Sequence, residues 1–93
     1  MSKPTGIKLK EFCKALEICA PLCGYEHLNH GFSGGSVYSF EFFQKKNDTK
    51  PMSIFIVHFG RGRKREIWSD DLKKVWERTA ISKEKFLDVL KNL

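Results

Sequence analysis

The chain has 93 residues, 41% of them hydrophobic and 13% aromatic, which is enough for one globular domain and too little for two. Lys and Arg number 17 against 11 Asp and Glu, and the net charge of +6 favours partners that carry phosphates or carboxylates. The sequence has neither an apolar run of the roughly 18 residues that a membrane span needs nor the apolar core of a signal peptide, so we expect a cytoplasmic protein that does not enter a membrane.

The first segment with a clear period is residues 8–20, which we expect to form an amphipathic helix. Pro21 is expected to end it, because proline lacks the N–H that a helix uses and clashes with the preceding turn. Residues 1–7, before the helix, are expected to be a flexible tail. The residues that share the apolar face are Leu9, Phe12, Cys13, Leu16, Cys19 and Ala20.

Strands are expected next, beginning with a short one over residues 25–30 and a Gly- and Ser-rich turn over residues 31–36. The clearest strand covers residues 37–43, where aromatic and polar residues alternate. Its aromatic face contains Tyr38, Phe40 and Phe42, and its polar face contains Ser39 and Glu41.

The polar segment 44–51 is predicted to be a hairpin loop that leads to a second long strand over residues 52–59. This strand is apolar on both faces, so we expect it at the centre of the sheet or beneath helices rather than at a free edge. Together the two long strands predict an antiparallel sheet.

The last third of the chain predicts a further helix and a second helical segment after it. Ser69 is expected to cap the helix, Asp70 and Asp71 place negative charge in its first turn, and Ser82 is expected to cap the second segment. The residues at helical spacing are Leu72, Val75, Trp76 and Thr79, then Phe86, Val89, Leu90 and Leu93. The order helix, strands, helices predicts one small α+β domain over residues 1–93, with the helices packed on one face of the sheet.

Four segments occur in a characteristic order. They are Gly24-Tyr25, the turn Gly34-Gly35-Ser36, Ser69-Asp-Asp-Leu-Lys-Lys-Val-Trp, and Ile81-Ser-Lys-Glu-Lys-Phe-Leu-Asp-Val-Leu. With them, about residues 8 to 93 resemble the HicA family of toxin–antitoxin modules. The resemblance implies a fold like a double-stranded-RNA-binding domain (dsRBD) in the order α-β-β-β-α, an mRNA-cleaving activity and a HicB-type antitoxin as partner. No cofactor is expected.

The chain departs from the HicA family at the turn, where HicA proteins have Gly-Ser-His and this sequence has Val37 after Ser36. The resemblance implies that the family's histidine serves in RNA cleavage, and a valine can neither take nor donate a proton. His58, near the end of the second long strand, is the candidate catalytic residue that remains, with His30 as the alternative. Because a histidine on a strand is more often structural, we expect the protein to cut RNA poorly or not at all.

Basic residues are concentrated between positions 45 and 65, where Asp48 is the one acid. The loops at 44–51 and 60–65 leave opposite ends of a predicted strand, so they are placed to contact separated phosphates of an RNA. Trp68, beside the second loop, is a candidate for stacking on a base. The predicted RNA-binding residues are Lys45, Lys46, Arg61, Arg63, Lys64 and Arg65.

Cysteine and histidine side chains near the first helix raise the question of a metal site. Cys13, Cys19 and Cys23 are expected to be thiols, because three cysteines cannot all pair within one molecule and the expected compartment is reducing. The group Cys19, Cys23, His27 and His30 lacks the spacing of a structural zinc site, so no metal is expected.

Three functions stay open at this point. The first is an RNA-cleaving HicA-like toxin with a relocated catalytic group, and the second is a HicA-like protein that binds RNA or an antitoxin without cutting. The third is a non-catalytic protein-interaction domain that offers its basic face to an acidic partner.

Overall fold

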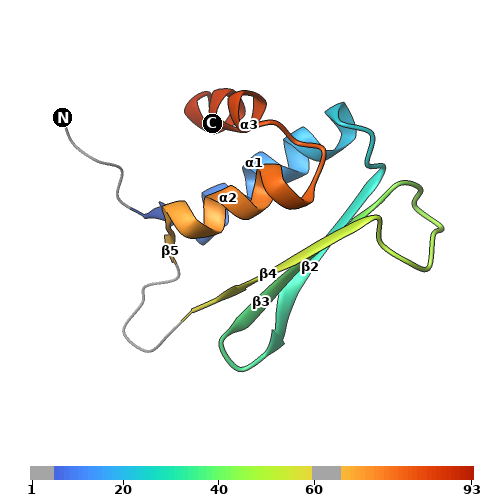
Figure 1. The fold of residues 1–93 in the computed structure, drawn as a ribbon, viewed down its shortest axis with the longest axis horizontal. Coiled ribbons are helices and arrows are strands. Elements are labelled where there is room, and N and C mark those ends of the chain that lie inside the picture. Colours follow the sequence, from blue (N-terminus) through green and yellow to red (C-terminus); the bar gives the residue numbers. More distant parts are fainter. Residues whose placement is uncertain (1–5, 60–65) are drawn as a thin grey trace.

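The computed structural model describes residues 6–59 and 66–93. Within these ranges it is a small α+β domain of three helices and five strands (Figure 1). In chain order the elements are β1 (Ile7–Lys8), α1 (Leu9–Leu22), β2 (His27–Gly34), β3 (Val37–Phe43), β4 (Ser53–His58), β5 (Glu66–Ile67), α2 (Ser69–Arg78) and α3 (Lys83–Lys91). The predicted α+β class is confirmed, and β1 and β5 are strands that the sequence analysis missed.

The main sheet is antiparallel with the strand order β2-β3-β4, and β1 and β5 form a separate two-stranded sheet. Ile7 in β1 lies opposite Ile67 in β5, and Ile67 is fully buried. This pairing holds the chain before α1 against the domain. The expectation of a flexible tail is therefore wrong for Ile7, while residues 1–5 lie outside the described residues.

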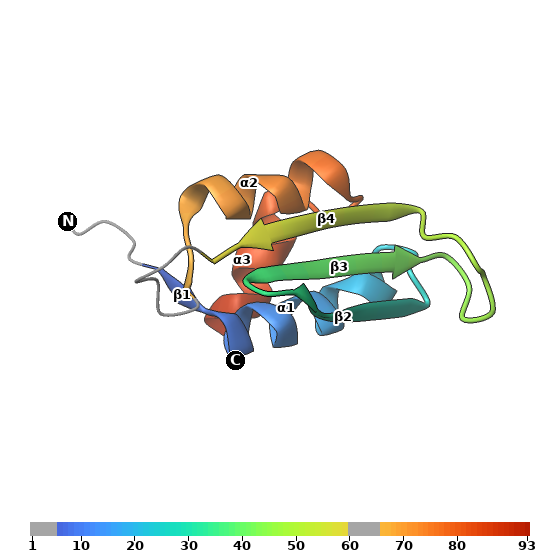
Figure 2. The ribbon, with the colours of Figure 1, turned by 90° about the horizontal axis from the view of Figure 1, so that it is seen from below.

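All three helices lie on one face of the main sheet, as predicted (Figure 1). α1 and α2 lie against the sheet, and α3 crosses them on the side away from it (Figures 1 and 2). Figure 2 looks onto the opposite face of the sheet, which none of the described helices covers. The domain therefore has two layers of helices on one side of the sheet and an uncovered sheet face on the other.

Aromatic side chains fill the core between the sheet and the helices. The ring of Phe12 on α1 lies 5.3 Å from that of Phe40 on β3 and 5.6 Å from that of Phe86 on α3. None of the three side chains is exposed to solvent. The predicted alternation of β3 is confirmed, because Tyr38, Phe40 and Phe42 are buried while the residues between them are half-exposed.

β4 was predicted to lie either at the centre of the sheet or beneath helices, and the second alternative holds, because β3 is the central strand and β4 lies at an edge of the main sheet. The other edge is β2, a full strand that pairs with β3 along its length. The edge at β4 is not free. α2 packs beside β4, and Nζ of Lys74 donates a hydrogen bond of 2.7 Å to the carbonyl oxygen of Ile56.

The extent of β2 and the end of α1 differ from the prediction. β2 continues to Gly34, so that the turn shrinks to Gly35 and Ser36, with Gly35 at φ 54°. Pairing with β3 explains the extension, since Phe32 lies opposite Tyr38 and their rings are 4.9 Å apart. Pro21 lies inside the last turn of α1 rather than ending it, where the missing N–H removes only one terminal hydrogen bond.

Of the two predicted helix caps, one is confirmed and the other is wrong. Ser82 caps α3 as predicted, because its hydroxyl accepts a hydrogen bond of 3.1 Å from the N–H of Lys85. The prediction for Ser69 is wrong, since Ser69 is the first helical residue of α2 and Trp68 occupies the cap position. Leu93 was placed on the buried stripe of the last helix, but it lies beyond α3 and is 52% exposed.

Candidate nucleic-acid interface

The uncovered face of the main sheet is formed by alternate residues of β3 and β4. The half-exposed residues of β3 on this face are Val37, Ser39 and Glu41. The exposed residues of β4 on it are Ile54, Ile56 and His58. This assignment follows from the buried aromatic residues, which must occupy the face beneath the helices because successive side chains in a strand point to opposite sides.

His58 and Val37 are direct neighbours on this face. The register of β3 and β4 places them opposite each other. The next pair along the two strands is Ser36 and Phe59, and the N–H of Phe59 donates a hydrogen bond of 2.8 Å to the carbonyl oxygen of Ser36. The pair Val37–His58 is therefore of the non-hydrogen-bonded type, in which opposite Cα atoms are about 4.5 Å apart and the side chains approach most closely. The structure thus puts His58, the candidate catalytic residue, directly beside Val37.

The loop at 44–51 lies at the other end of these strands and is held in place by two acids. Asp48 bridges the turn, because its carboxylate accepts the N–H of Lys45 at 3.1 Å while its own N–H donates to the carbonyl oxygen of Lys45 at 3.0 Å. Glu26 accepts the N–H of Lys46 at 2.9 Å. The two lysine side chains are exposed, so the loop presents both cations to solvent on an ordered backbone.

The predicted RNA-binding residues thus divide into two groups. Lys45 and Lys46 are described, and they follow the end of β3 that is remote from His58. Arg61, Arg63, Lys64 and Arg65 lie outside the described residues, as part of the segment 60–65. Trp68, the predicted stacking residue, is 44% exposed at the start of α2.

An acidic residue also lies on the uncovered face, between its two ends. Glu41 accepts a hydrogen bond of 3.0 Å from Nδ2 of Asn29, its cross-strand neighbour on β2. The alternation of β3 already predicted the face of Glu41, but not the amide that holds it. Its negative charge disfavours an anion on this part of the face.

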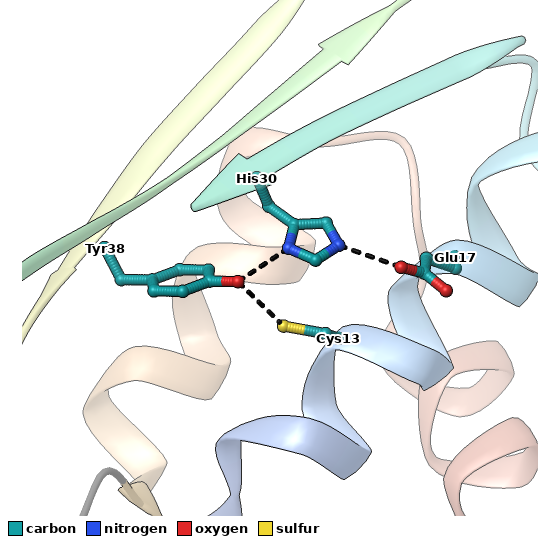
Figure 3. A network of polar contacts seen from close by, with 4 residues as sticks. All are labelled: Cys13, Glu17, His30 and Tyr38. Atoms are coloured by element: carbon teal, nitrogen blue, oxygen red, sulfur yellow. Dashed lines mark hydrogen bonds and ion pairs between the residues drawn. The ribbon is translucent and has the colours of Figure 1, made fainter. Parts of the chain in front are cut away.

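His30, the alternative catalytic residue, lies opposite the buried Phe40 and therefore on the other face of the sheet from His58. Its side chain points toward α1 (Figure 3). Its Nε2 is 2.8 Å from a carboxylate oxygen of Glu17, and its Nδ1 is 2.7 Å from the hydroxyl oxygen of Tyr38. The thiol of Cys13 in turn donates to that hydroxyl at 3.6 Å. His30 therefore does not share the surface of His58 and Val37.

The four residues form a continuous chain of polar contacts. The hydroxyl of Tyr38 contacts Nδ1 of His30 and also accepts a hydrogen bond from the thiol of Cys13, and Nε2 of His30 contacts Glu17. Both ring nitrogens of His30 contact other side chains of the protein, so His30 links β2 to β3 and α1. It is therefore not placed to act as an acid or base on a substrate.

Burial keeps two of the three thiols protonated. Burial raises the pKa of Cys19 to about 11, and it also raises the pKa of Cys13. Cys23 is only partly buried at the end of α1. In the described parts of the chain, Cys, His, Asp and Glu form no group of three that suits a metal ion.

This arrangement predicts selective alkylation of the folded protein. At about pH 7.5, iodoacetamide is expected to label Cys23 within minutes and to leave Cys13 and Cys19 unlabelled, because a raised pKa and burial both reduce attack by the thiolate. Intact-mass spectrometry should show one added group in buffer and three in urea. Equal labelling rates for all three cysteines in buffer would contradict the burial described above.

No protein-family model, curated protein or solved structure matches this chain. Within residues 6–59 and 66–93, no helix has the length and apolar character needed to cross a membrane.

Proposed function

We propose that this protein is a HicA-like RNA-binding domain with a dsRBD-like arrangement, which binds RNA across the uncovered sheet face and cuts it poorly. The observation that carries the proposal is the pairing of His58 with Val37 on that face. It supports the alignment of the turn at Ser36 with the HicA turn, because it puts an imidazole next to the position where the resembled family has its own.

The distribution of charge supports RNA as the ligand. Six residues of β4 separate its two ends, which at about 3.3 Å per residue is roughly 20 Å. The exposed lysines of loop 44–51 lie at one end, and the basic run Arg61-Gly-Arg-Lys-Arg follows the other end in the sequence. Two cationic sites separated in this way suit the successive backbone contacts by which proteins recognise the shape of an RNA duplex.

Slow cleavage follows from the number of acid–base groups on the face. Cutting RNA without a metal needs one group to take the 2′-OH proton and another to protonate the leaving 5′-oxygen. Val37 supplies neither, so His58 has no second imidazole beside it. Glu41 is four residues along β3 from Val37, or about 13 Å, which is too far to serve as its partner.

A protein partner is a second candidate for the same face. Ile54 is 48% exposed and Ile56 is 38% exposed on β4, and neighbouring exposed apolar side chains are typical of interaction surfaces. The resemblance to HicA proteins makes a HicB-type antitoxin the partner that we propose for this surface.

RNA binding is tested by fluorescence anisotropy with a labelled RNA hairpin over a range of salt concentrations. Replacing Lys45 and Lys46 with alanine is expected to weaken binding. The negative slope of log K against log salt should become less steep by about 1.4 to 1.8, since each phosphate contact contributes roughly 0.7 to 0.9 to its magnitude. Glu41→Gln is expected to strengthen binding, because it removes a negative charge from the face.

The matched control replaces Lys85 and Lys91 on α3, which are exposed on the helical side, with alanine. This variant loses the same charge and is expected to keep the wild-type salt slope. Equal effects of the two double variants would show that net charge alone governs binding, and a salt-independent affinity of the wild type would defeat the proposal.

A further inference from the structure

An apolar groove lies between α2 and α3, on the helical side of the molecule and away from the uncovered sheet face. Its volume is about 710 Å³. α2 contributes Leu72 and Trp76, and α3 contributes Leu87 and Leu90. Ile7 of β1 also lines the groove. A pocket of this size suits several apolar side chains of a ligand.

The groove exists because α3 packs mainly on α1 rather than on α2. Phe86 turns into the core against Phe12, which leaves Leu87, the next residue of α3, 38% exposed. On α2, Val75 is the buried residue, while Trp76 is only half-buried beside it. Apolar side chains of both helices therefore face the groove without filling it.

The connection between the two helices fixes the shape of the groove. The N–H of Ala80 donates a hydrogen bond of 2.8 Å to the hydroxyl of Tyr25, which is also 3.0 Å from the hydroxyl of Ser53. Ile81 is 1% exposed. These contacts tie the α2–α3 connection to the sheet, so the groove is formed before a ligand binds, and binding does not have to order it.

The charged residues that line the groove are both cations. Lys73 lies on α2 and Lys83 at the start of α3. Nζ of Lys83 is 5.9 Å from the centre of the Trp76 ring. No carboxylate is among the described residues that line the groove. An occupant with acidic groups beside its apolar side chains would match this surface.

We propose that the groove binds an apolar segment of a partner protein that is flanked by aspartate or glutamate residues. The N-terminal sequence next to Ile7, Met-Ser-Lys-Pro-Thr-Gly, contains a lysine and no acid, so charge disfavours it as the occupant. The groove is on the opposite side of the domain from the uncovered sheet face. This binding is therefore independent of the proposed RNA site.

The test is selection of peptides of about 12 residues from a random phage-displayed library against the folded protein. We expect enrichment of peptides that combine two or three large apolar residues with net negative charge. Synthetic versions should change the fluorescence of Trp76 in the variant Trp68→Phe, where Trp76 is the remaining tryptophan. Lys73→Glu combined with Lys83→Glu is expected to weaken their binding at least tenfold.

The matched control is Lys10→Glu combined with Lys14→Glu on α1, which changes the charge equally, away from the groove, and is expected to leave peptide affinity within about twofold. Leu87→Glu supplies a second groove variant at an exposed position that tolerates a polar residue, and it is expected to abolish binding. Circular dichroism verifies that each variant is folded.

Several results would overturn this proposal. They are enrichment of peptides without acidic residues, failure to enrich any sequence, and equal loss of binding in the two double lysine variants. Displacement of the peptides by an RNA hairpin would assign the groove to RNA instead. A dimer in sedimentation experiments that Leu87→Glu dissociates would assign it to a second copy of the chain.

Discussion

Replacing Phe12 with alanine is expected to lower the free energy of unfolding by about 3 to 5 kcal/mol, the range for removing a fully buried aromatic ring. Phe12 is 0% exposed and contacts the sheet and α3 at once, with its ring 6.4 Å from Phe55 in addition to its contacts with Phe40 and Phe86. A domain of this size typically has little more than 5 kcal/mol to lose, so the variant is expected to be largely unfolded at 37 °C. Urea titration followed by far-ultraviolet circular dichroism measures the change.

Phe32→Ala is the matched control for this substitution. It removes the same side chain from the edge strand β2, where Phe32 is 43% exposed. The expected loss is about 1 kcal/mol, since much of the ring is already in water. Similar losses for the two variants would contradict the position of Phe12 at the centre of the core.

Introducing a histidine at position 37 is expected to raise RNA cleavage by at least about a hundredfold, the lower limit for an added general acid or base. Val37→His would place two imidazoles side by side, because residue 37 lies opposite His58 in a non-hydrogen-bonded pair. One imidazole takes the proton of the 2′-OH as its oxygen attacks phosphorus. The other gives a proton to the departing 5′-oxygen, leaving a 2′,3′-cyclic phosphate. A labelled RNA assayed in EDTA measures the rate.

Two controls make this second experiment specific. Adding His58→Ala should return the rate to that of the wild type. Val37→Asn should be as well folded and as inactive as the wild type. A folded Val37→His protein that binds RNA but cuts no faster would reject the alignment of this turn with the HicA turn.

The elements that could be predicted from the sequence are those whose signal is local. The apolar period of residues 8–20 located α1, and the alternation of residues 37–43 gave the bounds and both faces of β3. Ser82 was recognised as a cap because a capping hydroxyl bonds an N–H three residues ahead. Each of these signals depends on the geometry of one element, so no knowledge of distant residues was needed.

The elements that were missed depend on partners far away in the chain. The two residues of β1 form a strand only because β5, near position 66, lies beside them. β2 extends through a Gly- and Ser-rich segment because β3 supplies its hydrogen bonds. The apolar composition of β4 suggested either a central strand or cover by helices, and the packing of α2 at that edge decided between the two. Pairing with a distant strand or helix cannot be recognised from the hydrophobic periodicity of the segment itself.

In the candidate sites, too, some features follow from local sequence patterns and others depend on contacts between distant residues. Alternation alone placed Val37, Ser39 and Glu41 on one face of β3, and basic composition singled out the loops. The neighbour of Val37 was decided by strand register, and a shift of one residue would have turned His58 to the other side. The bonding of His30 to Glu17 and the groove between α2 and α3 arise from how helices pack on the sheet. These contacts join residues that only the folded chain brings within a few ångströms of each other.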